Sequence, residues 1–187
     1  MYYEDMTFTK EDIDLLIFEN SEFFSCTFRG ITFDKISFNR TTLENCTFKS
    51  CQLTSSTFCD TKFIDLNFEN SELISINLSH INQFIIEVAF QNSYLKYCDL
   101  SKLDLKKIDL SNSTFKECLF FETNLSQAAF TNSNLEGSSF DNCNLERADF
   151  KGAVNYRINP LTNRIKGAKF SLPDLVGLVR DFDIKIV

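Results

Sequence analysis

The sequence has few of the features that mark secreted proteins, membrane proteins and nucleic-acid-binding proteins. It contains no tryptophan, five glycines and two prolines, and none of its hydrophobic runs approaches the length of a membrane span. The acidic N-terminus lacks the basic and apolar regions of a signal peptide. A formal net charge of −7 also disfavours direct binding to nucleic acid, which requires lysine and arginine against phosphate. We therefore expect a cytoplasmic protein that binds neither membranes nor nucleic acid directly.

Residues for catalysis and for holding metals are equally scarce. The single histidine, His80, cannot form a metal-binding pair, and no glycine-rich phosphate-binding motif occurs. Seven cysteines are present, and without an export signal we expect reduced thiols rather than disulfides. We therefore predict that the protein is not an enzyme and has no catalytic residues, no cofactor and no metal site.

The abundant feature is a large apolar residue at every fifth position. This central series runs from Phe8 to Leu78, slips, and resumes from Ile85 to Phe150, which gives 29 positions with 16 Phe, 11 Leu and 2 Ile. A second series of mostly small residues lies two places before the central residues. It includes six of the seven cysteines, which we expect to be buried packing residues: Cys26, Cys46, Cys51, Cys98, Cys118 and Cys143.

A period of five matches neither an α-helix nor a long β-strand. It is typical of a chain that turns a corner every five residues and points the first and third residues of each side inward. Four sides close a square coil, and neighbouring coils can pair as parallel strands ~4.8 Å apart. The 29 repeats therefore predict an all-β solenoid of about seven coils.

The repeat units resemble those of the pentapeptide-repeat family. The segments SNLEG (133–137), CNLER (143–147) and ADFKG (148–152) match its unit of a small residue, Asp or Asn, Leu or Phe, a polar residue and any residue. The resemblance covers roughly residues 6–153 and implies a right-handed quadrilateral parallel β-helix. We therefore expect a β-helical region over residues 1–153 and a C-terminal cap and dimerisation segment over residues 154–187.

One slip interrupts the repeat. Leu78 and the next central residue, Ile85, are seven residues apart instead of five, so two residues are inserted. If they bulge outward, one face still stacks Phe68 on Phe90, with Asn at the corner two places after each. The sequence therefore predicts one continuous coil with a small loop near residues 79–84.

The C-terminal segment predicts a short amphipathic helix. Ser171 is a candidate N-cap, and Pro173 lies in the first turn. Spacings of three and four residues place five apolar side chains on one face: Leu172, Leu175, Val176, Val179 and Phe182. This face either plugs the end of the coil or also pairs with a second copy, and we favour a homodimer. A short strand is expected over residues 183–187.

The C-terminal sequence also carries a more specific resemblance. The stretch INPLTNRIKGAKFSLPDLVGLV, followed by DFDIKIV, is similar to the tail of the Qnr-type quinolone-resistance proteins and their microcin-immunity relatives. The resemblance implies a rod-shaped dimer joined through C-terminal helices. It also implies binding to DNA gyrase and topoisomerase IV, and protection of these enzymes from fluoroquinolones or related poisons. Enterobacterial Qnr proteins carry two substantial loops, whereas this chain has one insertion of two residues.

Acidic residues concentrate in the repeat region. Residues 1–153 carry a net charge of −10 and residues 154–187 a net charge of +3. An anionic, DNA-like rod could enter a basic channel meant for DNA, and the same acids could instead serve only to keep a β rod soluble. Four acids without a base lie between Lys62 and Lys96, and together with the loop they are our candidate topoisomerase contacts: Asp65, Glu69, Glu72, Ser79, His80, Ile81, Asn82, Gln83, Phe84 and Glu87. The alternative function is a structural or scaffold protein that binds another partner and has no topoisomerase role.

Overall fold

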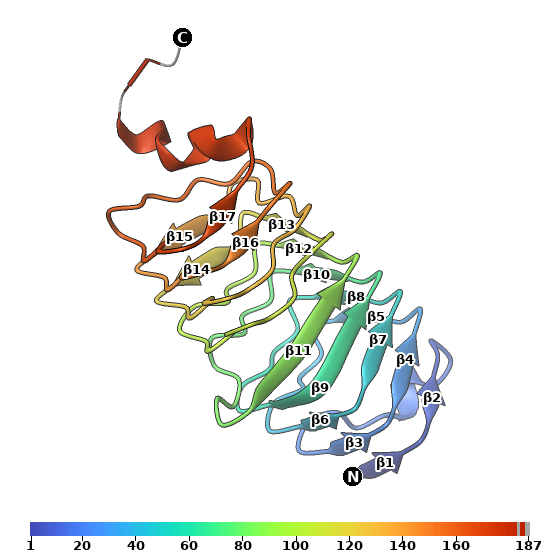
Figure 1. The fold of residues 1–187 in the computed structure, drawn as a ribbon. Helices are drawn as coiled ribbons and strands as arrows, with labels where there is room; N and C mark the ends of the chain where they lie inside the picture. Colours follow the sequence, from blue (N-terminus) through green and yellow to red (C-terminus); the bar gives the residue numbers. More distant parts are fainter. Residues whose placement is uncertain (183, 186–187) are drawn as a thin grey trace.

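The computed structural model describes residues 1–182, 184 and 185. The chain winds as a right-handed, four-sided parallel β-helix, and its coils stack into a rod (Figure 1). Most paired residues are 20 apart in the sequence, such as Phe28 and Phe48. The solenoid has about eight turns rather than the predicted seven, because a further turn brings Phe170 beside Phe150.

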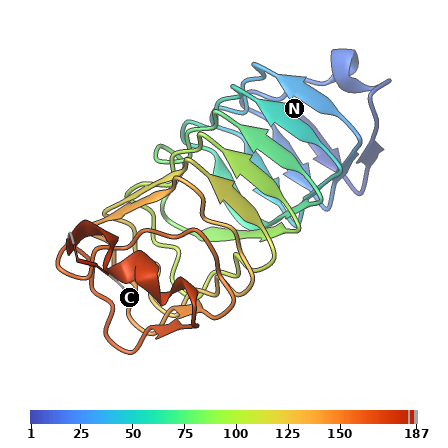
Figure 2. The ribbon, with the colours of Figure 1, turned by 90° about the horizontal axis from the view of Figure 1, so that it is seen from above.

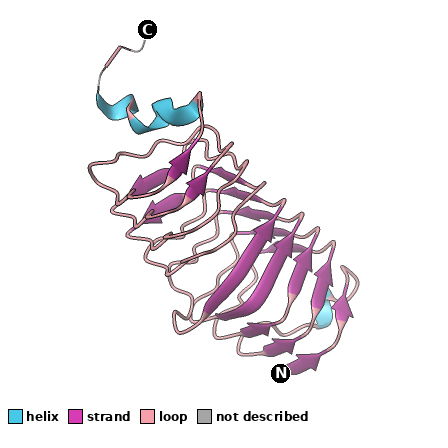
Figure 3. Ribbon diagram, viewed as in Figure 1, coloured by secondary structure: helices cyan, strands magenta, loops and turns pink. Residues whose placement is uncertain are grey.

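Short parallel strands form the sides of the coils, and most belong to two sheets (Figure 3). The larger sheet runs in the order β1-β3-β6-β9-β7-β4-β2, with β11 also paired to β9: β1 (Tyr2–Glu4), β2 (Thr7–Phe8), β3 (Glu22–Phe24), β4 (Thr27–Arg29), β6 (Thr42–Glu44), β7 (Thr47–Lys49), β9 (Lys62–Glu69) and β11 (Ile86–Gln91). The second runs in the order β13-β12-β10-β8-β5: β5 (Thr32–Asp34), β8 (Gln52–Thr54), β10 (Glu72–Ile74), β12 (Tyr94–Lys96) and β13 (Thr114–Lys116). Two further pairs lie toward the C-terminus: β14 (Leu119–Phe121) with β15 (Ser139–Asp141), and β16 (Asp149–Phe150) with β17 (Lys169–Phe170).

The core is a column of the central apolar residues. All of them are buried except Ile13, which is half-buried in the 3-10 turn η1 (Ile13–Leu15), and Ile85, which is 42% exposed. The small residues two places earlier line the same core and bond to the backbone of the preceding coil. The Ser71 hydroxyl, for example, donates to the Phe48 carbonyl at 2.9 Å. Such bonds explain how small polar side chains are accommodated in an apolar interior.

Phenylalanine rings stack from coil to coil along one face. The ring centroids are 4.6 Å apart for Phe28 and Phe48, 5.0 Å for Phe48 and Phe68, and 5.3 Å for Phe68 and Phe90. Offset aromatic pairs at these separations contribute beyond the burial of their apolar area. The last pair spans the insertion, so the prediction of one continuous coil is confirmed.

The six cysteines of the small series are buried, as predicted, and Cys59 is exposed. The Cys46 thiol donates to the Phe23 carbonyl at 3.4 Å. Burial raises the pKa of Cys46 to about 12 and that of Cys143 to about 11. At neutral pH these thiols are therefore protonated and act as small packing residues.

A left-handed residue forms the corner after almost every side of the coil. The φ angle is +63° at Gly30 and +49° at Asn70, two residue types that tolerate this conformation. The same conformation occurs at Tyr97 (φ +55°) and Glu117 (φ +52°). Left-handed backbone costs such residues roughly 1–2 kcal/mol each. The hydrogen bonds to the coils on either side therefore impose the left-handed conformation at each corner. The residue type changes only the free-energy cost of that conformation.

The C-terminal segment corrects the prediction of an amphipathic helix. Two 3-10 turns, η2 (Asp174–Leu178) and η3 (Arg180–Phe182), lie across the end of the rod (Figure 2). Pro173 is the N-cap of η2, whereas the Ser171 hydroxyl accepts a hydrogen bond from the Gly152 N–H at 3.0 Å. None of the described helical segments is long and apolar enough to cross a bilayer. The strand expected at the C-terminus lies largely outside the described residues.

One glycine brings this cap close to the coil. Gly177 is buried against Tyr156, where an added Cβ would lie 2.6 Å from the ring. Tyr156 is buried beneath it, and burial raises the pKa of its hydroxyl to about 12. Glycine weakens an α-helix by about 1 kcal/mol relative to alanine. Gly177 therefore allows the close approach that closes the core, and it also lowers the helix propensity of this segment.

Candidate partner-binding surface

The insertion begins later than the sequence suggests. Residues 79–82 still lie along the coil, as the hydrogen bond from the Asp60 N–H to the His80 carbonyl at 2.8 Å shows. His80 itself lacks the positive φ of the equivalent residue Asp60 (φ +54°). Ile81 is only 4% exposed and belongs to the core. The chain leaves the coil at residues 83–85.

The tip of this insertion exposes a phenylalanine. Phe84 is 91% exposed, more than any other large hydrophobic residue that the structure describes. Its N–H donates to the Asn82 side chain at 3.1 Å, and the Asn82 amide in turn donates to Asp60 at 2.9 Å. Ser79 and His80 bond to each other at the base of the loop, at 3.0 Å. The loop thus presents a phenylalanine, a residue type enriched at the cores of protein interfaces, on an anchored base.

The next corner after the insertion is missing. The corner of the preceding coil lies at Asp65 (φ +49°), and that of the following coil lies at Lys107 (φ +65°). Glu87 occupies the equivalent position between them and has no positive φ, so β11 runs straight through it. The pairing with β9 absorbs the change through a register shift between Ile86 and Val88.

On the side of β11 that faces away from β9, the hydrogen-bond ladder to the following coil is open. One coil later the ladder is closed, because the Leu110 N–H donates to the Ala129 carbonyl at 2.8 Å. The equivalent bond from the Phe90 N–H to the Asp109 carbonyl is absent among the described residues. So is the return bond from the Asp109 N–H to the Val88 carbonyl. β11 therefore pairs with β9 and not with the coil that follows it.

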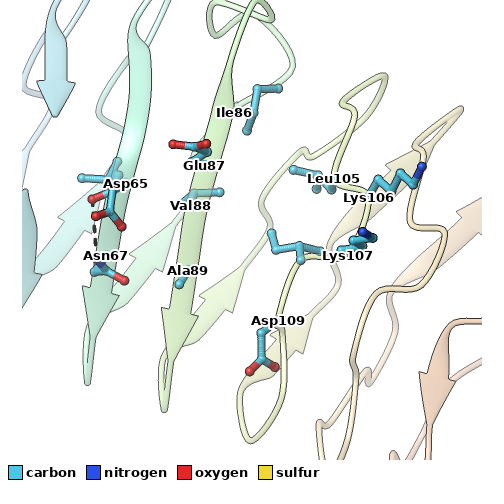
Figure 4. Close-up of a pocket in the computed structure, with 12 residues that line it drawn as sticks. Asp65, Asn67, Ile86, Glu87, Val88, Ala89, Leu105, Lys106, Lys107 and Asp109 are labelled. Atoms are coloured by element: carbon cyan, nitrogen blue, oxygen red, sulfur yellow. Dashed lines mark hydrogen bonds between the residues drawn. The ribbon is translucent and has the colours of Figure 1, made fainter. Parts of the chain in front are cut away.

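We call the resulting hollow the β11 groove. It has a volume of about 300 Å³ and lies between β11 and residues 105–109 (Figure 4). Asp65 and Glu87 lie on its acidic wall, and Lys106 and Lys107 on the opposite wall. Neither lysine forms an ion pair with another residue in the described part of the chain. Apolar side chains also line the groove: Val88, Ala89 and Ile108.

The four acids predicted as contacts do not form one cluster. Glu69 pairs with Lys49 of the preceding coil at 2.8 Å. Glu72 lies on β10, in the other main sheet. Only Asp65 and Glu87 come together, at the β11 groove.

Sequence reasoning missed both Lys106 and Lys107. A search for bases along the chain cannot find neighbours that lie one coil away. The signal that could have found them is the coil length, since Lys107 follows Glu87 by 20 residues, as Phe48 follows Phe28.

The residues predicted for a dimer interface lie in and beside the cap. Gly177 and Leu178, which were not among them, contact the coil. The five predicted residues remain exposed or half-buried at the end of the rod: Leu172, Leu175, Val176, Val179 and Phe182.

The chain was compared with protein-family models, with curated proteins and with solved structures. Residues 88–170 match the family model of a pentapeptide repeat region. A trypsin-treated variant of QnrB1, a plasmid-mediated fluoroquinolone resistance protein, is similar with a TM-score of 0.52 and 15% identity, over 100% of this chain and 99% of that one. HetL, a pentapeptide repeat protein involved in heterocyst differentiation regulation from the cyanobacterium Nostoc sp. strain PCC 7120, is 14% identical over 84% of this chain and 89% of its own, with a TM-score of 0.40. No curated protein matches the sequence significantly.

The coil geometry and its repeated left-handed corners define the molecule as a quadrilateral parallel β-helix. The same five-residue unit continues from the matched region back through the strands that precede it. Residues 88–170 form a pentapeptide repeat region, and the similarity of the whole chain to QnrB1 is one of fold.

Proposed function

We propose that the protein binds the type II topoisomerases DNA gyrase and topoisomerase IV and protects them from fluoroquinolones or related poisons. The observation that carries this proposal is the insertion face, which we define as residues 83–85 together with Asp65 and Glu87. This face combines a 91% exposed phenylalanine with two carboxylates on a rod whose fold is similar to that of a fluoroquinolone resistance protein. The location proposed for this activity is the cytoplasm.

The mechanism requires binding only. A net charge of −10 over residues 1–153 would steer the rod toward a basic surface that otherwise holds a DNA duplex. Phe84 would then anchor the complex, because buried aromatic side chains dominate protein interfaces. The acidic groups would set the association rate and its salt dependence more than the final affinity.

A supercoiling assay tests the proposal directly. Gyrase inhibited by a fluoroquinolone should recover supercoiling when the wild-type protein is added. Phe84→Ala should weaken gyrase binding by at least 10-fold, as expected for an interface anchor worth about 2 kcal/mol. Leu161→Ala is the matched control, because Leu161 is 78% exposed and lies in the C-terminal segment. A wild-type protein that neither binds gyrase nor restores supercoiling would favour the scaffold function instead.

Salt dependence tests the electrostatic part. The double change Asp65→Lys and Glu87→Lys should weaken gyrase binding more at low salt than at high salt, because exposed charges are screened as salt rises. Asp34→Lys is the control, since Asp34 is exposed on β5 in the other sheet. An effect per reversed charge that is equal in the double change and in the control would indicate a general charge effect and would argue against a contact at the insertion face.

We also propose that two copies pair through the outer side of the cap. Leu172 is 81% exposed there, with four further apolar side chains that are less exposed. Apolar patches on a soluble chain mark interaction sites. Sedimentation should show a native dimer that Val179→Asp dissociates and the control Leu161→Asp does not. A native monomer would contradict the proposal.

A further inference from the structure

We infer that the β11 groove binds an extended segment of the partner protein, which adds a strand to the open side of β11. The inference deepens the proposed function, on which it rests for the identity of the partner. It assigns a role to the open hydrogen-bond ladder beside β11 and to Lys106 and Lys107. The exposed loop explains neither of these features.

The main-chain groups of β11 carry the inference. Successive residues of a strand direct their N–H and C=O groups to opposite sides, so Ala89 pairs with β9 while Val88 and Phe90 face the groove. Val88 presents both its N–H and its C=O there. Phe90 presents its N–H, because its carbonyl accepts a hydrogen bond from the Ser113 hydroxyl at 2.9 Å. Asp109 presents the matching groups from the other wall, and no backbone hydrogen bond described in the structure joins the two sides. Each closed ladder elsewhere in the rod shows what these groups normally bind, which is another extended chain.

The chemistry of the groove favours a peptide over a small ion. Donors and acceptors alternate along β11, as they do in a polypeptide backbone, whereas an anion needs donors and a cation needs acceptors. The two walls carry opposite charge, with Asp65 and Glu87 on the side of β9 and β11 and Lys107 on the other. Lys106 also lines the groove, but its side chain points away from β11 (Figure 4). The segment that fits is therefore extended and carries both acidic and basic side chains.

The size of the groove agrees with a short stretch of chain. A volume of about 300 Å³ lies at the lower end of the ~300–1,000 Å³ range of ligand sites. The floor of Val88, Ala89 and Ile108 offers apolar contact for a side chain that points inward. Strand addition of this kind draws affinity from main-chain bonds and specificity from the side chains that alternate along the strand.

Hydrogen exchange followed by mass spectrometry tests the inference on the wild-type chain with purified DNA gyrase. Peptides that cover residues 86–92 and 104–111 should exchange quickly in the free protein and at least 10-fold more slowly in the complex. A peptide that covers residues 113–117 is the internal control, because its ladder to β12 is already closed. Its exchange should not change.

A matched pair of lysines gives the second measurement. Lys102 and Lys107 are both exposed corner residues, with φ angles of +63° and +65°, and only Lys107 lines the groove. Lys107→Glu should weaken gyrase binding by at least 10-fold and Lys102→Glu by less than 2-fold. Gyrase binding without slower exchange in the groove peptides would overturn the strand addition and leave the proposed function intact. Failure of the wild-type chain to bind gyrase at all would overturn both.

Discussion

Asp65, Glu87 and Lys107 occupy equivalent positions in three successive coils, yet only the first and third form a left-handed corner. The identity of the middle residue is not the reason. Glu117 and Glu122 are also glutamates, and both adopt positive φ, at +52° and +54°. What differs at Glu87 is the register, because the insertion just before it shifts the strand against β9.

This difference shows how the repeat controls the backbone. A residue with a closed ladder on both sides is held in a conformation that its own preference would not select. The two inserted residues release that constraint on both sides of the insertion, at His80 and at Glu87, neither of which has a positive φ. The strand that follows, β11, loses its partner on one side. The groove and the exposed loop therefore arise from the same local failure of the repeat, between regular coils on either side.

The largest effect should come from breaking the stack that holds all three coils. Phe68 is fully buried between Phe48 and Phe90, whose ring centroids lie 5.0 and 5.3 Å away. Phe68→Asp would bury an unpaired charge and should unfold the protein, with loss of its far-UV β signal at 25 °C. Phe84→Asp is the control and should leave the spectrum unchanged, because Phe84 is exposed. Full stability of Phe68→Asp would show that the central series is assigned wrongly.

The regular part of the fold could be predicted because the five-residue period reports burial directly. The groove could not, because its walls come from residues 20 or more apart whose separation depends on one register shift. Ile85 illustrates the limit. By spacing it belongs to the central series, but the structure leaves it 42% exposed, since the chain rejoins the coil one residue later at Ile86. The C-terminal segment forms two 3-10 turns in place of the predicted amphipathic helix, and apolar spacing along the chain does not reveal the contact of Gly177 with Tyr156 that holds it against the coil.

The contact of Gly177 with Tyr156 gives the second prediction, which compares two glycines that the fold requires for different reasons. Gly177 is required for space, whereas Gly30 has no atom within 4 Å of an added Cβ and is required only for its φ of +63°. Gly177→Ala should cost about 1–3 kcal/mol as overpacking against the ring. Gly30→Ala should cost about 1 kcal/mol from its backbone conformation alone. Denaturant unfolding of both variants measures the two costs, and a smaller loss for Gly177→Ala would contradict the close packing of the cap.

Restoring the register should close the groove. Deletion of Gln83 and Phe84 would place Ile85 five residues after Leu78, in the central position, and Glu87 at the corner. Burial of Ile85 and recovery of two backbone bonds should stabilise the protein by about 1–3 kcal/mol. Hydrogen exchange in residues 86–92 should slow in the free protein. Fast exchange there after the deletion would show that the insertion is not what opens the ladder.

The smallest expected effect concerns the backbone conformations of Glu87 and Lys107. At Lys107 the φ of +65° penalises a side chain by roughly 1–2 kcal/mol, which exceeds the ~0.5–1 kcal/mol entropic cost of glycine. Lys107→Gly should therefore stabilise the protein by about 0.5–1 kcal/mol. Glu87 lies in a straight strand without positive φ, so Glu87→Gly carries only the cost of glycine and should destabilise by about the same amount. Urea unfolding of the two variants should give shifts of opposite sign. Shifts of the same sign would mean that the two positions share one backbone conformation, and the missing corner would lose its support.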